Sequence, residues 1–205
     1  MCTQFFIEPE IEEIVEVLDE ARSSRLNDRF IKAGSAVLTS GVIKPTNVVP
    51  VIASDKRGRR SVFPMKWGFK NTNRPLLVNA RSETAAEKPT FKDSWAQHRC
   101  IIPAAWYFEW EHFKDANGRE KVGEKYMIQP KNASVTWLAG LYRIENDLPV
   151  FVVLTREPSD ELRRIHDRMP LILPKNIIDG WIDPHSEPGN LLQYALTEVV
   201  MEVVV

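Results

Sequence analysis

The first candidate for chemistry is the cysteine at the second position of the chain. Removal of Met1 would leave Cys2 with a free α-amine beside its thiol, a 1,2-aminothiol. Reference pKa values of about 8 for the amine and about 8.5 for the thiol make both groups partly available as nucleophiles near neutral pH. An aldehyde would form an imine with the amine, and the neighbouring thiol could then close a five-membered thiazolidine ring.

A second candidate, Glu109, lies in an aromatic segment that reads as a β-strand. Alternation along a strand places Trp106, Phe108 and Trp110 on one face, which we predict to be core, and Tyr107 and Glu109 on the other. That other face would meet either water or a cleft. In a cleft, desolvation would raise the carboxyl pKa toward the range that is useful for proton transfer.

His166 follows Leu162 and Ile165 at the end of a helix predicted over 159–167, which Pro170 would stop. A histidine near a helix C-terminus is favoured as the cation by the dipole, and histidine is the side chain best suited to change charge near pH 7. It could be a proton carrier or simply a structural cap. His98, His112 and His185 lack a comparable context, and we expect them to be surface or structural residues.

Asn79 and Arg81 end an apolar strand and share one of its faces. A fixed amide can orient a reacting group without titrating, and an arginine fork suits phosphate. On residue type alone, a simple strand end explains both better than a functional role does.

Metal and disulfide chemistry find little support in the sequence. Cys2 and Cys100 cannot form a disulfide framework, and no CxxC pair or close Cys/His cluster indicates zinc. We therefore expect no metal and no cofactor, with Cys100 a reduced and inert thiol.

The elements that must position these residues are mostly short strands. Ile11, Ile14, Val15, Leu18 and Ala21 recur at helical spacing and predict an amphipathic helix over 10–22. Asp115 to Gly118 should join two strands as a hairpin. Because strands and helices do not alternate regularly, we predict an α+β fold for residues 1–205 as one domain, a curved, mostly antiparallel sheet or open barrel with short peripheral helices. The predicted strands are 47–53, 61–69, 76–80, 99–102, 105–112, 125–129, 135–142, 150–154 and 169–173, and the other predicted helices are 91–97, 175–182 and 188–196.

The charges are nearly balanced in number but separated along the chain. The 205 residues carry 27 basic and 28 acidic side chains. Eight basic residues and no acidic one lie between Lys56 and Arg81, which could form a positive face or only a solvated basic loop. No apolar run approaches the roughly 20 residues of a membrane helix, and the N-terminus lacks the features of a secretory signal, so we expect a cytoplasmic protein.

Taken in order along the chain, these segments resemble the SRAP family, the SOS response-associated peptidase domain that caps abasic sites in DNA. The matching segments are Met1-Cys2 with Phe5, Lys44-Pro45-Thr46, Trp67-Gly68, 79–84, 99–103 running into Phe108-Glu109-Trp110, and 166–170. Each is short, but together they cover nearly the whole chain.

The resemblance implies a compact α+β domain that traps the aldehyde of abasic sites in single-stranded DNA, and it would place the protein on the nucleoid during DNA damage. It implies Cys2 as nucleophile, Asn79 as an orienting group, and Glu109 and His166 as proton carriers in crosslink formation, in its reversal and in autoproteolytic removal of Met1. It also implies a monomer that contacts DNA through Arg81, Trp67, Gly68, Pro45, Thr155, Arg168 and Lys70.

Two departures from the family pattern concern DNA contact. Thr3-Gln4 replaces the usual Gly-Arg after the cysteine, and segment 69–75 lacks the additional tryptophan found in many members, so stacking would fall to Trp67 or Phe69. The residues also allow two other functions. One is an N-terminal cysteine hydrolase of amides with no role for DNA. The other is a single-stranded DNA-binding module without covalent chemistry, whose affinity would fall steeply with salt.

Overall fold

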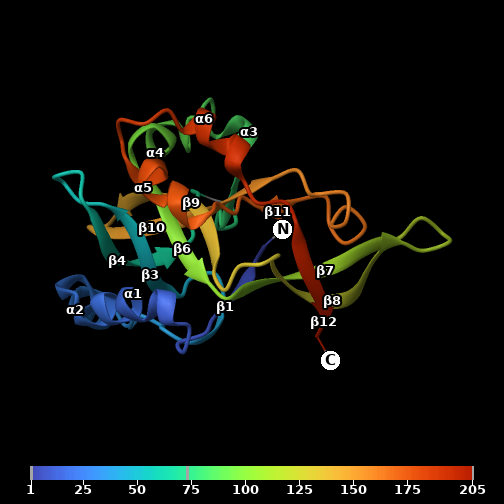
Figure 1. Cartoon of the computed structure of the whole chain (residues 1–205), viewed down its shortest axis with the longest axis horizontal. Coiled ribbons are helices and arrows are strands. Elements are labelled where there is room, and N and C mark those ends of the chain that lie inside the picture. Colours follow the sequence, from blue (N-terminus) through green and yellow to red (C-terminus); the bar gives the residue numbers. More distant parts are fainter. Residues whose placement is uncertain (1, 73, 205) are drawn as a thin grey trace.

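The fold is described from a computed structural model, which covers residues 2–72 and 74–204; Met1, Asn73 and Val205 lie outside the described residues. Two β-sheets form its centre, with short helices at two ends (Figure 1). The strands are β1 (Gln4–Ile7), β2 (Gly41–Ile43), β3 (Val48–Ser54), β4 (Arg60–Trp67), β5 (Asn79–Arg81), β6 (Arg99–Ala104), β7 (Trp106–Lys114), β8 (Glu120–Pro130), β9 (Thr136–Glu145), β10 (Leu148–Arg156), β11 (Met169–Pro170) and β12 (Val199–Val203).

Seven strands form the larger sheet, which closes on itself. Its path runs β11-β10-β4-β3-β6-β9, with β5 paired to β10, and a further pairing of β10 with β9 completes a five-stranded ring. Two pairings in this sheet, β10 with β4 and β10 with β5, are parallel. The α+β prediction is confirmed, and the ring is a closed barrel.

The second sheet has the antiparallel order β12-β8-β7-β1-β2. Its β7–β8 hairpin extends away from the body of the molecule, and the predicted turn at Asp115 to Gly118 forms its tip (Figure 1). Phe5 and Ile7 of β1 are fully buried and join the core of the molecule, which fixes the start of the chain against the barrel.

Helices cover two ends of the sheets (Figure 1). The helical elements are α1 (Glu12–Ser23), α2 (Arg25–Lys32), α3 (Ser82–Ala85), α4 (Lys92–Gln97), η1 (Lys175–Ile177), α5 (Ile178–Ile182), α6 (Pro188–Leu191) and η2 (Leu192–Tyr194). Helix α1 matches its predicted segment, although Val17 rather than Val15 faces the core and Val15 is exposed. The predicted helix over 159–167 is wrong, because this segment forms consecutive turns.

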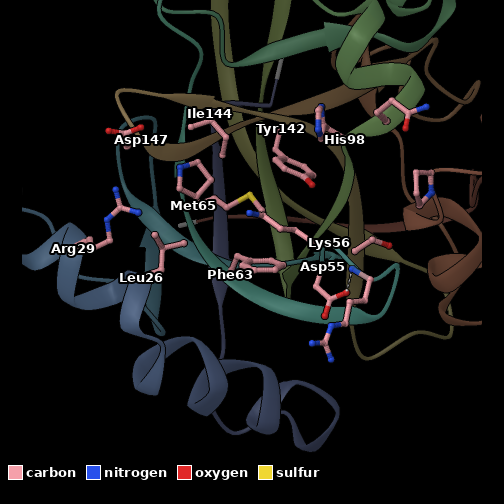
Figure 2. A pocket seen from close by; sticks show the side chains of 15 residues that line it. Leu26, Arg29, Asp55, Lys56, Phe63, Met65, His98, Tyr142, Ile144 and Asp147 are labelled. Atoms are coloured by element: carbon pink, nitrogen blue, oxygen red, sulfur yellow. Dashed lines mark hydrogen bonds between the residues drawn. The ribbon is translucent and has the colours of Figure 1, made fainter.

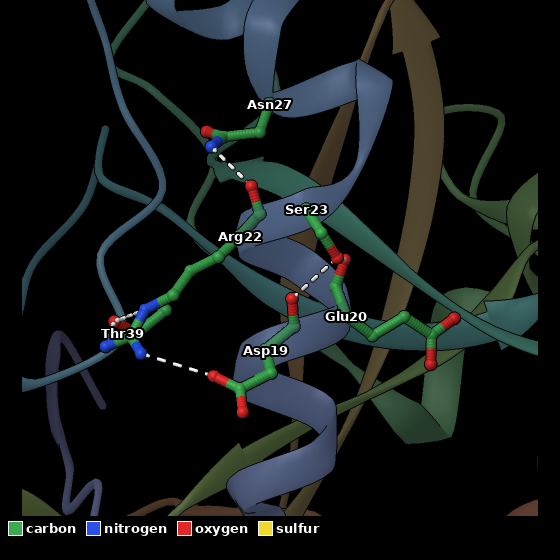
Figure 3. A network of polar contacts seen from close by, with 6 residues as sticks. All are labelled: Asp19, Glu20, Arg22, Ser23, Asn27 and Thr39. Atoms are coloured by element: carbon green, nitrogen blue, oxygen red, sulfur yellow. Dashed lines mark hydrogen bonds and ion pairs between the residues drawn. The ribbon is translucent and has the colours of Figure 1, made fainter.

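The junction of α1 and α2 is fixed by polar contacts (Figure 3). Arg22 Nε donates to Thr39 Oγ1 at 2.8 Å, and Asn27 Nδ2 donates to the carbonyl oxygen of Arg22 at 3.1 Å. Ser24 caps α2 by accepting from the Leu26 N–H, which satisfies one of the backbone donors at the start of that helix. No helix among the described residues is long and apolar enough to cross a membrane.

Candidate active site

Strand β1 delivers Cys2 to the interior of the molecule. The strand pairs with β7 in a register that sets Phe5 opposite Tyr107, and Phe5 is fully buried. Cys2, three residues earlier, is only 1% exposed, and its thiol donates a weak hydrogen bond to the carbonyl oxygen of Gln4 at 3.7 Å. The cysteine is therefore buried in the core of the protein, where its position is fixed.

Asn79 contacts the same end of the chain from the barrel. It begins β5, which pairs in parallel with β10 so that Asn79 lies opposite Val153. Its Nδ2 donates to the Cys2 carbonyl oxygen at 2.9 Å. Its Oδ1 is buried and has no hydrogen-bond partner among the described residues, an arrangement that is costly unless a ligand supplies a donor. The amide thus holds Cys2 with one atom and offers an acceptor with the other.

Glu109 lies on β7, and its burial shows that the face of this strand that carries Tyr107 and Glu109 is interior. Tyr107 and Glu109 are 1% and 3% exposed, whereas Trp106 and Trp110 are half-buried and lie outside the core. The prediction that Trp106, Phe108 and Trp110 face the core holds only for Phe108, which is buried. The opposite face, with Tyr107 and Glu109, is also buried and is directed toward the barrel. Glu109 therefore occupies the interior, and its Oε1 accepts from the Trp110 N–H at 3.3 Å.

The buried groups interact electrostatically. Burial, with a further contribution from the Glu109 carboxylate, raises the pKa of the Cys2 thiol well above its ordinary value. Burial also raises the pKa of Glu109. For the Tyr107 hydroxyl, burial and the charges of Cys2 and Glu109 raise the pKa. These mutual effects show that Cys2, Tyr107 and Glu109 share one desolvated region.

Tyr107 was not among the residues singled out from the sequence. Its hydroxyl is buried without a hydrogen-bond partner among the described residues, in the same region as Cys2 and Glu109. Strand alternation already places it on the face of Glu109, which was the available signal.

His166 reaches this region from the turns that precede β11. Its Nδ1 lies 2.7 Å from Asp167 Oδ1 and 3.0 Å from the Arg168 backbone nitrogen. Burial first, then the charge of the N-terminal amine and to a smaller extent that of His112, lowers the pKa of His166 to about 4 against the opposing effect of Asp167. The expectation that a helix dipole favours the cation is wrong, because there is no helix here and the ring is desolvated.

His112 was expected to be a surface or structural residue, yet it lies beside His166. The two ring centroids are 5.1 Å apart at an interplanar angle of 79°, and the His112 backbone N–H donates to the Ile165 carbonyl oxygen at 2.9 Å. The β7–β8 register shifts between Trp110 and His112, an irregularity of the kind that increases local twist. Simple alternation would have placed His112 away from Glu109, so sequence reasoning could not find it.

Glu109, His112 and His166 each present one possible metal-ligand atom, and these atoms lie within 4.8 Å of one another. One carboxylate and two imidazoles form a donor set that suits zinc or a related divalent ion. This cluster is the part of the site that could hold a metal.

Four of the residues expected to contact DNA are buried. Trp67 is fully buried and donates from Nε1 to the Val78 carbonyl oxygen at 2.9 Å, and it packs against Phe5 with ring centroids 5.2 Å apart. It therefore ties the segment before Asn79 to the strand that carries Cys2, and it has no face available to stack on a base. Phe69, the other predicted stacking residue, is also fully buried.

Gly68 contributes backbone geometry. Its φ is +116°, and a Cβ there would lie 2.3 Å from Leu76 Cδ2, so the position requires glycine. Its buried N–H donates to the Phe151 carbonyl oxygen at 2.7 Å, which leaves no exposed surface for DNA.

Thr155 and Arg168 form a buried support under the site. Thr155 is fully buried and lies opposite Arg81 in β5 and Pro170 in β11. Arg168 is 8% exposed, donates to the Thr155 carbonyl oxygen at 2.9 Å, and pairs with Glu83 at 2.7 Å. Their burial argues against direct contact with DNA in this conformation and assigns them to positioning β5, β10 and β11.

Arg81, Lys70 and Pro45 remain accessible. Pro45 is half-buried. Arg81 and Lys70 are exposed, and neither of these two cations takes part in an ion pair among the described residues. Part of the basic stretch is neutralised, since Arg59 pairs with Asp55 and Arg60 with Asp179. At least these two of the eight basic side chains are therefore partly neutralised by carboxylates.

The chain is similar to known proteins in sequence and in fold. The chain is 29% identical to the abasic site processing protein YobE of Bacillus subtilis over 207 residues, covering 96% of this chain and 88% of YobE. It is 27% identical over 146 residues to the abasic site processing protein YedK of Escherichia coli, covering 66% of this chain and 63% of YedK. A crystal structure of a Bacteroides thetaiotaomicron protein has the same fold, with a TM-score of 0.71 at 19% identity, covering all of this chain and 92% of that one. Residues 1–204 match the family described as SOS response associated peptidase (SRAP), and the chain belongs to that family.

Proposed function

We propose that this protein binds single-stranded DNA and captures abasic sites covalently through Cys2. The observation that carries the proposal is the burial of Cys2 at the end of β1, where it is bonded to Asn79 and interacts electrostatically with Glu109. Relatives named abasic site processing proteins support the choice of an abasic site as the target.

The reaction begins once Met1, which lies outside the described residues, has been removed. The α-amine of Cys2 attacks the aldehyde carbon of the ring-opened abasic sugar, and loss of water gives an imine. The Cys2 sulfur then adds to the imine carbon while the thiol proton ends on the nitrogen, which closes a thiazolidine. Because burial keeps the thiol protonated, the amine forms the first bond and the sulfur adds second.

Glu109 and His166 have complementary properties for the proton transfers. A carboxyl with a raised pKa can donate a proton to the leaving hydroxyl, and the resulting carboxylate can then relay the thiol proton to the nitrogen of the new ring. A neutral imidazole can accept a proton from the attacking amine. Asn79 holds the Cys2 carbonyl group, so the new amine is fixed in position throughout.

DNA contact falls to the accessible cations near β5. Arg81 is two residues from Asn79 on an exposed position of the strand, where its guanidinium can pair with a phosphate beside the lesion. Lys70 and Pro45 would extend this surface. The buried residues Trp67, Gly68, Thr155 and Arg168 would act only through the positions of their neighbours.

The direct test is incubation with single-stranded DNA that carries one abasic site. We expect an adduct that survives denaturation, that is absent in Cys2→Ala, and that forms only on chains whose intact mass shows loss of Met1. Lack of an adduct, or an equal yield from Cys2→Ala, would refute the proposal. Turnover of amide substrates without an adduct would favour the hydrolase, and salt-sensitive DNA binding that survives Cys2→Ala would favour the non-covalent module.

A further inference from the structure

A cavity with a volume of about 700 Å³ shares no lining residue with the candidate active site (Figure 2). Helix α2, the β3–β4 turn, strand β4, the C-terminal end of α4 and the β9–β10 hairpin all contribute to its wall. Its size lies within the range of about 300 to 1,000 Å³ that is usual for small-molecule sites. The residues that line it include Arg29, Asp55, Lys56, Arg57, Phe63 and Tyr142.

Aromatic and apolar side chains form one part of this cavity. Phe63 and Tyr142 are half-buried, and Met65 is 1% exposed. His98 packs edge-on against Tyr142 with ring centroids 5.0 Å apart, and the Tyr142 N–H donates to the His98 carbonyl oxygen at 2.9 Å. Burial, with a contribution from Cys100, raises the pKa of Tyr142 to about 12, so its hydroxyl stays protonated and can donate a hydrogen bond. Such a surface suits a flat aromatic group that carries acceptors.

Cationic side chains form the other part. Arg29, Lys56 and Arg57 are exposed, and within residues 2–72 and 74–204 none of them has a carboxylate partner. Figure 2 shows Lys56 between the side chains of Phe63 and Tyr142. These cations are therefore available to a ligand with negative charge.

The acidic residues of the cavity do not cancel this charge. Asp55 pairs with Arg59 at 2.7 Å, and its other oxygen accepts the backbone N–H groups of Arg57 and Arg59. Hydrogen bonds from Arg59 first, and from Arg57, lower the pKa of Asp55 to about 2. Asp147, at the β9–β10 turn, is the remaining carboxylate, so three cations face one unpaired acid.

We propose that this cavity binds a nucleotide, with the base against Phe63 and Tyr142 and the phosphate at Lys56, Arg57 and Arg29. Aromatic rings stack on any base, and lysine and arginine neutralise the phosphate, so the two halves of the cavity match the two halves of the ligand. The same chemistry is present in a free mononucleotide and in one nucleotide of a single strand.

The test is calorimetric titration of the whole chain with thymidine 5′-monophosphate, thymidine and inorganic phosphate. We expect saturable binding of the monophosphate, and binding at least about tenfold weaker for either half alone, as expected when a charge-assisted contact or a stacking contact is lost. Absence of saturable monophosphate binding, or equal affinity for inorganic phosphate alone, would overturn the proposal.

Two double variants locate the binding. Lys56→Gln with Arg57→Gln removes two cavity cations and should weaken monophosphate binding by about tenfold or more. Arg119→Gln with Lys121→Gln removes the same charge from exposed positions on the β7–β8 hairpin and should leave the affinity unchanged. Equal affinities of the two variants would overturn the assignment. If a variant at Lys56 proves unstable, Tyr142→Phe can be titrated with the monophosphate instead. It removes the hydroxyl but keeps the ring, so it is expected to retain the stacking contact.

Competition separates the two sources of the nucleotide. Displacement of the monophosphate by an undamaged thymidine oligonucleotide would indicate a site for a strand, and binding that the oligonucleotide leaves intact would indicate a free nucleotide. Titration of Cys2→Ala makes the result independent of the proposed covalent chemistry, because this variant should bind the monophosphate as the unaltered chain does.

Discussion

The side-chain Nδ2 of Asn79 donates a 2.9 Å hydrogen bond to the backbone carbonyl oxygen of Cys2, 77 residues away in the chain. This bond links the barrel, through β5, to the start of β1. It places the reactive end of the chain by contact with a backbone atom, so the contact would persist whatever bond the Cys2 amine or sulfur forms. A non-titrating donor is well suited to that task.

The role of this donor can be tested by exchanging the amide. Asn79→Ala and Asn79→Asp should both reduce the rate of adduct formation by about fivefold, because both lose the donor and a single hydrogen bond contributes about 1 kcal/mol. Single-turnover crosslinking to abasic DNA measures the rate. A normal rate in Asn79→Asp, which keeps the size of the side chain, would contradict the donor role.

Glu109→Gln should slow adduct formation by about 100-fold or more, since the amide has nearly the same shape but cannot transfer a proton. Binding of undamaged single-stranded DNA should be unchanged, because Glu109 is buried away from the DNA surface. Rates come from quenched crosslinking and affinities from anisotropy. Glu111→Gln, on the same strand, serves as the matched control and is expected to retain the normal rate.

Substitution of Arg81 should affect DNA binding, whereas substitution of Arg168 should affect stability, although the family resemblance predicts both as phosphate ligands. Arg81→Ala should weaken DNA binding and reduce the slope of log affinity against log salt by about one, because it removes one exposed cation. Arg168→Ala should instead lower the Tm, because it leaves Glu83 and the Thr155 carbonyl oxygen without their partner. A normal Tm and a reduced salt slope in Arg168→Ala would restore it as a phosphate ligand.

The depressed pKa of His166 predicts an acid-sensitive stability. Unfolded His166 takes up a proton near its ordinary pKa of 6.5, while the folded residue does so only near pH 4. The unfolded state therefore binds more protons between these values, and the contribution of this residue to stability falls as the pH drops from 6.5 to 4. His166→Gln should flatten the dependence of Tm on pH across this window relative to the unaltered chain. An unchanged dependence would show that the His166 pKa is not depressed.

His112 should influence the reaction through His166. Its positive charge disfavours the His166 cation, so His112→Gln should raise the pKa of His166 and move the acid limb of the crosslinking rate to higher pH. Rates measured from pH 4 to 7 test this, with the exposed His185→Gln as control. A general loss of rate with no shift of the profile would assign His112 a purely structural role.

EDTA should leave the crosslinking rates of all these proteins unchanged, because the proposed chemistry uses no metal.

The amino-acid sequence determined the local features of this protein. Period-two and helical patterns placed most strands and α1, turn chemistry placed the β7–β8 hairpin, and residue chemistry singled out Cys2, with Asn79, Glu109 and His166, before any contact was known. The predictions of strands, helix and turn succeed because propensity and alternation depend on residues that are close together in the chain.

Only the tertiary structure decided which faces are buried and which distant residues meet. Strand alternation separates Tyr107 and Glu109 from Trp106 and Trp110, but the pairing of β7 with β1 decides that the charged face is interior. Likewise, ring closure by β10 buries Trp67 and Thr155, and the irregular β7–β8 register accompanies the approach of His112 to His166. Burial is a property of long-range packing, so a residue such as Trp67 or Arg168 can look like a surface ligand in the sequence and act as a support in the fold.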